Sequence, residues 1–533
     1  MSAQEINVDL AYDVAIVGYG PVGQTLAALL GRAGHRVVAF DRYPTAYLLP
    51  RAVRFDHELM RIFQGIGAVR HIAHDITTAD SYLWYGAQGQ LILDIDNRGP
   101  SPSGWARDYV FYQPTLEAAL DLSARTFPTV SVQRGWEVVG LGQGAGHAEL
   151  HLREHGKTGP IDGGPTRVVR ARYVVGADGA NSFVRNALGI EREDLGFREE
   201  WFVVDVRPHD MADFAHLPVA AQYCDPKRPH VAVLTGPRHR RWEFMLLPGD
   251  DRHEFRTSPA KAWELLAPYL TPEQGTLVRQ AVYEFRSRLA NTLRSGRFLL
   301  AGDAAKQMPP FMAEGMCSGV RDAANLAWRL DLALRGLIGA AALDSYTTER
   351  QGQNRATVSV SLQMGKVSCT LDPEAAAARD AAFLAGVVPA PVPVPPLGAG
   401  VLHAPGLDPI AGRISVQGRI GTASGEGLSD DLAGPGFRLV CVQGDAVAAL
   451  GTDRMAFLRR LRAAVVCLDP SVPGAAKDLD GALTSWLSDN GLVAALSRPD
   501  FYAFGGASSL AELPALVEDL RAQLGSPAGG TGA

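Results

Sequence analysis

The stretch that most constrains the fold is YDVAIVGYGPVGQTLAALLGRAGHRVVAFDR, at residues 12–42. A short β-rich run at 14–17 leads into the glycine pattern GYGPVG, and the apolar spacing that follows predicts a helix to about Ala33. Gly34 suits the end of that helix, and RVVAFD predicts a second buried strand ending in Asp41. Strand, glycine turn, helix, strand and acid in this order predict a βαβ unit that binds a dinucleotide. The alternative is a glycine turn in an ordinary βαβ unit.

The residues of this turn have different expected roles. Gly18 permits the tight turn, Gly20 lets the backbone approach a pyrophosphate, and Gly23 lets the helix pack against the strand. The free N–H groups at the start of the helix favour phosphates, and Asp41 is placed to accept hydrogen bonds from a ribose. The residues predicted to bind the dinucleotide here are Gly18, Gly20, Pro21, Val22, Gly23, Asp41 and Arg42.

Composition excludes several classes of protein. The chain of 533 residues is too long for one hydrophobic core, and 47% hydrophobic with 20% charged residues is typical of a globular protein. The net charge of -6 is mild and no basic stripe stands out, so we expect no nucleic-acid partner. His71 and His74 are the one close pair of histidines, with no metal-like cluster of cysteines or acids around them, so we expect no metal site.

Cysteine usage and the N-terminus bear on location. The five cysteines form no CxxC pair, which favours a reducing compartment. The N-terminal stretch MSAQEINVDLAYD is polar and acidic, unlike a signal peptide, and the sequence has no apolar run of about 18 residues that could span a membrane. We therefore expect a cytoplasmic protein with no membrane partner.

Two later segments repeat the device of a buried strand that ends at a carboxylate. ARYVVGADGANSFVR, at 171–185, reaches Asp178-Gly179, and GRFLLAGDAAKQMPPF, at 296–311, reaches Gly302-Asp303. The order GxGxxG, DG, GD resembles the class A flavoprotein aromatic hydroxylases, the group that includes para-hydroxybenzoate hydroxylase and phenol hydroxylase. The stretches PRAVRFDHELMRIFQGIG, YQPTLEAAL, RRWEFMLLPGDD and PPFMAEGMCSGVRDAANLAWRL most resemble 3-(3-hydroxyphenyl)propionate hydroxylases, and the similarity spans nearly the whole chain.

This resemblance implies FAD as the cofactor, NADH or NADPH as a transient reductant, and O2 and a small phenol as substrates. Oxygen would reach the ring through a flavin C4a-hydroperoxide, so no side chain is assigned as catalytic. No second glycine-rich βαβ unit occurs in the sequence, so the nicotinamide is expected to bind transiently against the FAD domain.

The resemblance also assigns residues to FAD. Gln113 matches a glutamine that contacts the flavin, Arg51 an arginine that contacts FAD or the nicotinamide, and Asp178 a carboxylate implicated in binding both. The alternatives are a polar helix end, an exposed structural arginine and a structural turn, respectively. Asp303, after Gly302, can accept a hydrogen bond from the ribityl chain because the alanines beside it allow close approach; the alternative is that it caps the next turn.

The segment after Asp303 supplies the expected surroundings of the flavin ring. Pro309 and Pro310 fix an extended turn, a rigid wall for the ring. The next segment is expected to begin irregular at Gly315 and then form an amphipathic helix, whose first amides face the flavin and stabilise its negative charge. Lys306 stands where the related hydroxylases usually have histidine; it could neutralise Asp303 or a phosphate, or point to solvent. The candidates at the helix start are Gly315, Met316 and Cys317, with no nucleophilic role expected for the cysteine.

The fold class expected is α/β, with a Rossmann-like FAD-binding domain, an inserted antiparallel-sheet substrate domain and a C-terminal thioredoxin-like domain without CxxC. Alternation in RWEFMLLP, at 241–248, predicts a half-buried strand in the substrate domain, with Arg241, Glu243 and Met245 facing one way. The FAD domain is expected at 1–190 and 291–370, with a hairpin at 80–95 that reaches the substrate domain at 191–290. A helix end and Pro-rich linker at 371–400 precede the C-terminal domain at 401–525, and a disordered tail follows at 526–533. Within the C-terminal domain we expect strands near 437–445 and 462–470, a connection at 497–505 and a helix at 512–525.

The predicted function is an FAD-dependent monooxygenase of a phenolic ring, with 3-(3-hydroxyphenyl)propionate as a candidate substrate. Arg198, Arg238 and Arg241 are candidates to bind the carboxylate of such a substrate. One alternative is a tailoring hydroxylase of a polyketide or other larger aromatic. Another is a non-catalytic FAD or nucleotide carrier, which has no need for Gly302-Asp303 or the PPF stretch. A homodimer, with the C-terminal domain in a packing or dimerisation role, is a further expectation.

Overall fold

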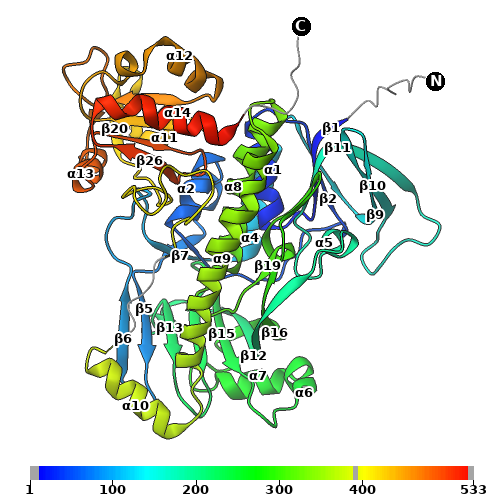
Figure 1. Cartoon of the computed structure of the whole chain (residues 1–533). Helices are drawn as coiled ribbons and strands as arrows, with labels where there is room; N and C mark the ends of the chain where they lie inside the picture. The colour runs from blue at the N-terminus through cyan, green and yellow to red at the C-terminus, as the bar shows by residue number, and fades with distance from the viewer. Residues whose placement is uncertain (1–10, 388–393, 526–533) are drawn as a thin grey trace.

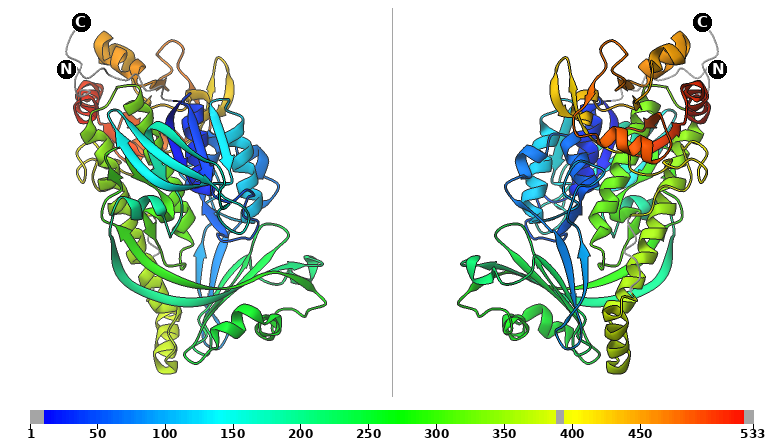
Figure 2. Two further views of the ribbon diagram at one scale, coloured as in Figure 1. Left: turned by 90° about the vertical axis from the view of Figure 1, so that its right-hand side faces the viewer. Right: turned by 90° about the vertical axis from the view of Figure 1, so that its left-hand side faces the viewer.

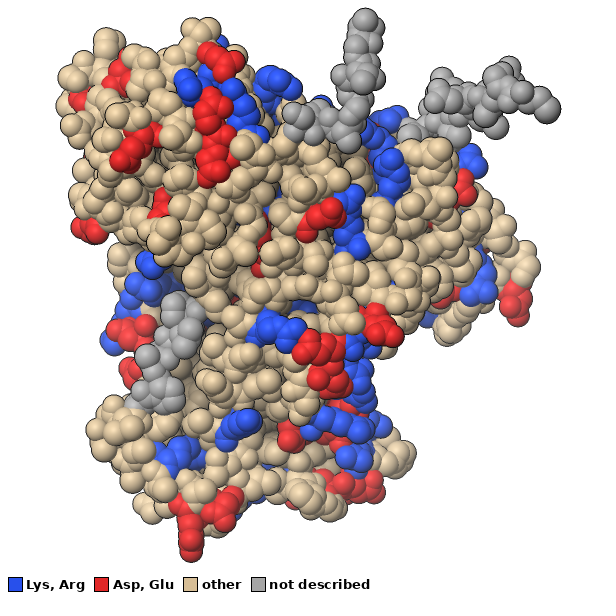
Figure 3. Space-filling model, viewed as in Figure 1, with Lys and Arg blue, Asp and Glu red and all other residues tan. Residues whose placement is uncertain are grey.

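The structure is a computed structural model that describes residues 11–387 and 394–525 (Figure 1). The expectations for the extreme N-terminus, the tail at 526–533 and part of the Pro-rich linker therefore lie outside the described residues. No helix in the described ranges has the length and apolar character needed to cross a membrane. On the face shown in Figure 3, basic and acidic side chains are interspersed.

The first large sheet contains the predicted βαβ unit. Its central strands run parallel, with β1 between β11 and β2, and a β9–β10 hairpin extends β11 on one edge. The order across the sheet is β17 (Arg294–Ser295), β18 (Phe298–Leu300), β11 (Thr166–Gly176), β1 (Tyr12–Val17), β2 (Val37–Asp41) and β8 (Val130–Arg134), with β9 (Trp136–Gly144) and β10 (His147–Glu154) off this path. The two expected strands that end in DG and GD are thus neighbours, because β11 pairs with β18.

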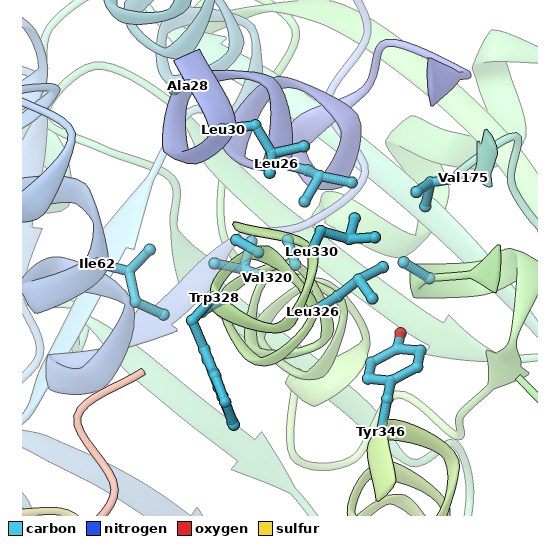
Figure 4. Packing of buried hydrophobic residues seen from close by; sticks show 14 of the residues in the cluster. Leu26, Ala28, Leu30, Ile62, Val175, Val320, Leu326, Trp328, Leu330 and Tyr346 are labelled. Atoms are coloured by element: carbon cyan, nitrogen blue, oxygen red, sulfur yellow. The ribbon is translucent and has the colours of Figure 1, made fainter. Parts of the chain in front are cut away.

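Helices α1 (Pro21–Arg32), α4 (Gln113–Arg125), α8 (Glu314–Leu334) and α9 (Ala340–Ser368) belong to the same body as this sheet. Figure 4 shows α8 almost end-on, with apolar side chains from α1, β11 and α9 pointing toward it. Leu26 of α1, Leu326 of α8 and Tyr346 of α9 are all fully buried there. The core is therefore built around α8, whose start lies at the expected flavin site.

The second large sheet is the expected substrate sheet, and all its pairings are antiparallel except that of β13 with β5. Its order is β19 (Lys306–Gln307), β16 (Gly275–Ala290), β12 (Arg192–Pro208), β15 (Arg240–Met245), β14 (His230–Leu234), β13 (Ala220–Tyr223), β5 (Ser81–Tyr85) and β6 (Leu91–Asp96). The predicted hairpin is β5–β6, which joins the sheet at β13. The two-residue strand β19 begins three residues after Asp303, so it links the GD loop to the substrate sheet.

The predicted alternation in β15 is confirmed. Trp242 and Phe244 are buried in a cluster that includes Phe255 of α6 (Arg252–Thr257) and Leu266 of α7 (Pro259–Leu266). The alternate residues face the other side of the sheet, toward the FAD-binding body. Figure 2 shows the curved sheet with α6 and α7 below it and the first body above it.

Smaller elements complete this part of the chain. A three-stranded sheet is formed by β3 (Arg54–Asp56), β7 (Asp108–Phe111) and β4 (Ile76–Thr78), with α2 (His57–Gly65), α3 (Val69–Ile72) and α5 (Phe183–Ala187) elsewhere in the first body. Helix α10 (Pro373–Leu384) lies along the β5–β6 hairpin, where Asp380 Oδ2 accepts a hydrogen bond from Ala87 N at 2.7 Å.

The C-terminal part contains a four-stranded sheet in the order β23 (Ala464–Cys467), β22 (Arg438–Cys441), β25 (Ala494–Ser497) and β26 (Ala503–Ala507). β22 and β23 are parallel, and the other two pairings are antiparallel. The remaining helices here include α12 (Ala446–Arg460), α13 (Ala482–Asp489) and the predicted α14 (Leu513–Leu524). The expectation of a plain connection at 497–505 is wrong, because β26 begins at Ala503. The strand pattern is hard to recognise in the sequence because the strand contains two glycines, Gly505 and Gly506. Glycine is needed at 506 because a Cβ there would lie 2.9 Å from Leu492 Cδ2.

Buried ion pairs join this C-terminal part to the first body. Glu349 of α9 accepts hydrogen bonds from Arg329 of α8 at 2.5 Å and from Arg498 of the C-terminal part at 2.8 Å. Arg61 of α2 is fully buried and bonds both carboxylate oxygens of Asp430 at 2.5 and 2.9 Å. The C-terminal part is therefore attached through ion pairs that are buried away from water.

Candidate functional site

The glycine turn has the geometry that the sequence predicts. Gly18 has φ +97, and a Cβ there would overlap the carbonyl of Ala177, with its carbon 2.6 Å away, so the turn lies against the end of β11. A Cβ on Gly23 would overlap the Gly18 carbonyl oxygen, so α1 packs closely on the turn. Nothing lies within 4 Å of a Cβ placed on Gly20, and no side chain caps α1. The N-terminal end of α1 is thus open to an anion.

Val22 brings three motif segments together. A Cβ on Gly302 or on Gly319 of α8 would lie 3.0 or 2.7 Å from Val22 Cγ2. Gly302 has φ +64, a conformation that glycine adopts without strain. The GD loop and α8 therefore meet the first turn of α1 at close range.

Asp41 ends β2 beside the glycine turn. Its Oδ2 accepts a hydrogen bond from Tyr19 N at 3.1 Å, and its Oδ1 accepts one from Tyr43 N at 2.9 Å. Arg42 next to it is exposed, with its guanidinium 5.0 Å from the centre of the Tyr43 ring. Asp41 is only partly buried, so its carboxylate can still accept a bond from a ligand.

Asp178 has the contacts of a structural turn. Its Oδ1 accepts a hydrogen bond from Ser182 Oγ at 2.5 Å and its Oδ2 one from Val184 N at 3.1 Å, at the start of α5. Burial raises the pKa of Asp178, although these bonds oppose the rise. These contacts describe the structural alternative, and a role of Asp178 in binding FAD or nicotinamide stays a prediction.

Gln113, the first residue of α4, holds the segment that carries Arg51. Gln113 Oε1 accepts hydrogen bonds from the backbone N–H groups of Arg51 and Ala52, at 2.8 and 2.6 Å, while Nε2 donates to Glu117 Oε1 at 2.6 Å. The Arg51 side chain is 53% exposed and lies over the Tyr47 ring, 4.8 Å from its centre. Gln113 therefore positions the loop, and Arg51 is available to a ligand.

Asp303 has a carboxylate in the GD loop that is unpaired among the described residues. The residue is exposed, yet protein surrounds it so closely that burial raises its pKa, against the opposing effects of Lys306 and then Arg51. No hydrogen bond reaches its carboxylate from any residue in the described ranges. The alternative role as a turn cap has no supporting contact, whereas Arg51 from another motif lies near enough to influence it.

One expectation for Lys306, a position in solvent, needs correction. Its side chain is buried, which contradicts a position in solvent, and it pairs directly with Asp322 of α8 rather than with Asp303. Asp322 also accepts hydrogen bonds from Arg350 Nε at 2.7 Å and from Gly302 N at 3.0 Å. Burial lowers the pKa of Lys306. Lys306 and Gly302 of the GD loop are therefore both held by the Asp322 carboxylate of α8.

Helix α8 begins one residue earlier than expected and without irregularity. Glu314 is its first residue, and the break in regular structure is at Ala313, a non-glycine residue in the left-handed region with φ 52. A Cβ on Gly315 would meet nothing within 4 Å. Met316 is half-buried, and Cys317 is buried with a pKa raised well above its usual value by burial, which agrees with a non-nucleophilic thiol.

An ionic cluster without any local signal in the sequence fixes the start of α8. Glu314 is buried and pairs with Arg54 at 2.8 Å and with Arg321 at 2.7 Å. Arg54 also pairs with Asp108 at 2.7 Å, and Arg321 also pairs with Glu58 at 2.6 Å. These partners come from α2, β3, β7 and α8, so only the tertiary fold brings them together.

The PPF stretch forms a wall between α9 and the substrate sheet. Pro309 O accepts a hydrogen bond from Ser361 Oγ of α9 at 3.2 Å. The Phe311 ring, after Pro310, contacts the Trp201 ring edge-on at 5.9 Å between centres. It also packs on Gly365 of α9, where a Cβ would lie 2.8 Å from Cζ and closer to two other ring atoms.

The three arginines suggested as carboxylate anchors are already paired. Arg198 and Arg238 are 72% and 69% exposed, and they pair with Glu284 and Asp75. Arg241 is buried and bonds both oxygens of Asp205, at 2.7 and 3.0 Å. It also donates to the carbonyls of Pro50 and Arg51, at 2.8 and 2.5 Å, so it supports the Arg51 loop from the substrate sheet.

Comparison with known proteins decides the family. A family profile described as an FAD binding domain matches residues 11–361, and one described as the HcaD C-terminal domain matches residues 412–523. The chain is 39% identical over 519 residues to a Rhodococcus jostii (strain RHA1) protein named "Probable NADH-specific resorcinol 4-hydroxylase", across 96% of this chain and 94% of that one. The chain belongs to the FAD-dependent aromatic hydroxylases.

Further relatives of this hydroxylase agree. It is 32% identical over 518 residues to 3-(3-hydroxy-phenyl)propionate/3-hydroxycinnamic acid hydroxylase 2 of Burkholderia vietnamiensis (strain G4 / LMG 22486), across 92% of each chain. Its fold matches that of the flavin-dependent monooxygenase PieE in complex with FAD and substrate, with a TM-score of 0.80 and 22% identity over 97% of this chain and 99% of that one. It also matches a ternary complex of aklavinone-11 hydroxylase with FAD and aklavinone, with a TM-score of 0.76 and 25% identity over the same shares.

The expected family, fold class, FAD cofactor and monooxygenase activity on an aromatic ring are therefore confirmed. The geometry fits the cofactor, since a Cβ on Gly20 or Gly315 would meet nothing within 4 Å and Asp303 is exposed. A non-catalytic carrier is excluded by the family. The tailoring hydroxylases share the fold, but the relatives of higher identity are named for small phenols.

Proposed function

We propose that this hydroxylase acts on an uncharged resorcinol-type ring, with NADH as the reductant. The observation that carries the proposal is the charge balance on the face of the substrate sheet that is directed at the FAD-binding body. Arg241 and Arg279 lie there beside Asp205 and Glu243, so two cations face two acids. Both arginines also donate to the carbonyl of Pro50.

A carboxylated substrate would add an unpaired negative charge to this balanced, water-poor face, which is costly in a low-dielectric site. A dihydroxybenzene brings hydroxyl donors and no charge. The name of the Rhodococcus relative, which specifies resorcinol and NADH, supports the same choice over a phenylpropionate.

The residues proposed to hold FAD divide by its parts. The open N-terminal end of α1, from Gly18 to Gly23, receives the pyrophosphate, and Asp41 the adenosine ribose. Asp303 accepts a bond from the ribityl chain, and the amides from Gly315 to Cys317 face the flavin ring. When bound, the reduced flavin supplies the electrons that activate O2 for insertion of one oxygen atom into the ring.

The protein's own part in the reaction is positioning and exclusion of water. The wall of Pro309, Pro310 and Phe311 separates the cleft from α9 and abuts the aromatic side chains of the substrate sheet. Arg51, held by Gln113 and Arg241, is proposed to contact FAD or the nicotinamide as it docks on the FAD domain. Such fixed contacts orient the ring without reorganisation during the reaction.

The test is a substrate panel on the purified, FAD-loaded protein. Resorcinol and 3-(3-hydroxyphenyl)propionate are compared for stimulated NADH and NADPH oxidation, O2 uptake and transfer of labelled oxygen from O2 to product. With NADH as the reductant, we expect kcat/KM for resorcinol to be at least about 10-fold higher than for 3-(3-hydroxyphenyl)propionate. This ratio corresponds to about 1.4 kcal/mol. A preference for the phenylpropionate contradicts the charge argument, and no stimulation by any phenol contradicts the proposed function.

We also propose a cytoplasmic location, a homodimer and the domain ranges given above. The scattered free cysteines support the first proposal. Sedimentation of the FAD-loaded protein tests the second, since a monomer mass at micromolar concentration contradicts it. Limited proteolysis tests the ranges, because the first cuts are expected between the proposed domains, and first cuts within a domain contradict them.

A further inference from the structure

Glu243 occupies the centre of the substrate sheet, opposite the flavin motifs. Two residues before it on the same face, Arg241 donates to the Arg51 loop, and two residues after it, Met245 packs in one cluster with Phe311. The Arg51 loop and the Phe311 wall are the two segments that bound the proposed flavin site on this side. Glu243 therefore lies between them, under the space that the aromatic ring would enter.

The Glu243 carboxylate lacks a good partner. Its Oε1 is 3.5 Å from Arg241 Nη1, at the limit of a hydrogen bond, while Arg241 gives its short bonds to Asp205. Its Oε2 accepts no hydrogen bond from any residue in the parts of the chain that the structure describes. The cross-strand neighbours are Val203 and Val231, which offer no donors.

The surroundings make this carboxylate unusual for a structural group. Its side chain is 14% exposed in the middle of a covered sheet, so the exposed part faces an internal space. Burial raises the pKa of Glu243, and the proximity of Arg241 opposes the rise. A largely buried carboxylate with one long hydrogen bond is costly to the fold. A ligand hydroxyl would remove that cost.

A second polar position flanks the same space. Tyr82 of β5 donates to Gln222 Oε1 at 3.3 Å, and Gln222 Nε2 donates in turn to His230 O at 3.1 Å. Burial raises the pKa of Tyr82, and Glu243 contributes to the rise, so the two groups lie near each other. The titratable and charged groups that face Glu243 from the neighbouring strands are Asp205, Arg241, Arg279 and Tyr82.

We propose that Glu243 accepts the hydrogen bond of the substrate's phenolic hydroxyl and removes its proton as the ring is hydroxylated. The O–H bond of the substrate breaks, an O–H bond forms on Glu243 Oε2, and the electron pair stays on the ring oxygen. The resulting phenolate is richer in electrons at the ring carbons ortho and para to that oxygen. This proposal rests on the proposed function and identifies Glu243 as the general base of that reaction.

The test compares Glu243→Gln with Glu284→Gln in the FAD-loaded protein. Glu284 is a matched control because it lies on β16 of the same sheet but faces away, paired with Arg198 and Arg286. We expect both variants to retain FAD. Glu243→Gln should lose about 100- to 10,000-fold in kcat for hydroxylation, the range of general base catalysis, and release H2O2 instead of product.

A readout that a structural role would not move is the dependence on phenol acidity. Fluorinated resorcinols, which ionise at lower pH, should recover activity in Glu243→Gln far more than in the wild type. Glu243→Asp keeps a carboxylate and should show no such recovery, and this variant serves if the glutamine variant does not fold. Equal loss for all resorcinols, or a Glu243→Gln variant as active as Glu284→Gln, contradicts the proposal. The comparison uses whichever phenol the wild type hydroxylates, so failure with resorcinol alone contradicts only the proposed substrate.

Discussion

Replacing Gly365 of α9 by alanine should displace the Phe311 ring from its place beside the flavin cleft. A Cβ on Gly365 would lie 2.5 Å from Cδ2 and 2.8 Å from Cζ of that ring. Carbon atoms pack at about 3.5–4.0 Å, so the ring must move by roughly 1 Å. Such overpacking costs about 1–3 kcal/mol, partly offset by the gain of about 0.5–1 kcal/mol when alanine replaces a helical glycine. The net free energy of unfolding should fall by up to about 2 kcal/mol.

The same helix contains a matched control. A Cβ on Gly352 would meet nothing within 4 Å, so Gly352→Ala should stabilise the protein by about 0.5–1 kcal/mol. Urea unfolding of both FAD-loaded variants measures the difference. A shift of about 1 Å in the wall should also lower coupled hydroxylation by up to about 100-fold while FAD content stays unchanged. Adding Phe311→Leu should restore part of the lost stability. If Gly365→Ala were as stable and as well coupled as Gly352→Ala, the ring would not lie against α9.

Four further variants test the supports of the site and the attachment of the C-terminal part. Asp303→Ala should abolish FAD retention, whereas Asp41→Ala should weaken FAD binding by about 1.5–3 kcal/mol in a flavin titration; equal effects contradict the division of roles. Lys306→Met leaves the buried Asp322 with one cation and should lower the free energy of unfolding by about 1–3 kcal/mol in urea, so an unchanged midpoint opposes the pairing. Burial alone would raise the pKa of Glu349, but its two arginines outweigh it and lower the pKa to about 2 from 4.5. Glu349→Gln should thus lose about 3 kcal/mol at pH 7, and less as pH falls from 4.5 toward 2; a deficit independent of pH contradicts this.

Local patterns predicted the parts of the site that are close in sequence. The βαβ unit follows from a strand, a glycine turn and a helix in direct succession, and the faces of β15 follow from alternation alone. The strand that ends at Asp303 was readable because an apolar run stops abruptly at a carboxylate.

Contacts between distant segments could not be predicted in this way. Lys306 is close to Asp303 in the sequence, but its ion-pair partner is Asp322, which α8 places beside it. The bonds from the backbone of Arg51 and Ala52 to the Gln113 oxygen were likewise not predicted, while its contact with the flavin stays a prediction. Such partners depend on how separate elements pack, and a single sequence carries no signal for that.

The attachment of the C-terminal sheet has a consequence for how this chain could have evolved or be shortened. Loss of that sheet would take Arg498 from Glu349 and Asp430 from Arg61, a side chain with no exposure to water. Glu349 would keep Arg329 as a partner, whereas Arg61 would lose its carboxylate, and both side chains would lose the protein that now covers them. An ancestor or a truncated descendant with the same catalytic body would therefore present Arg61 to water, where Asp430 now binds it.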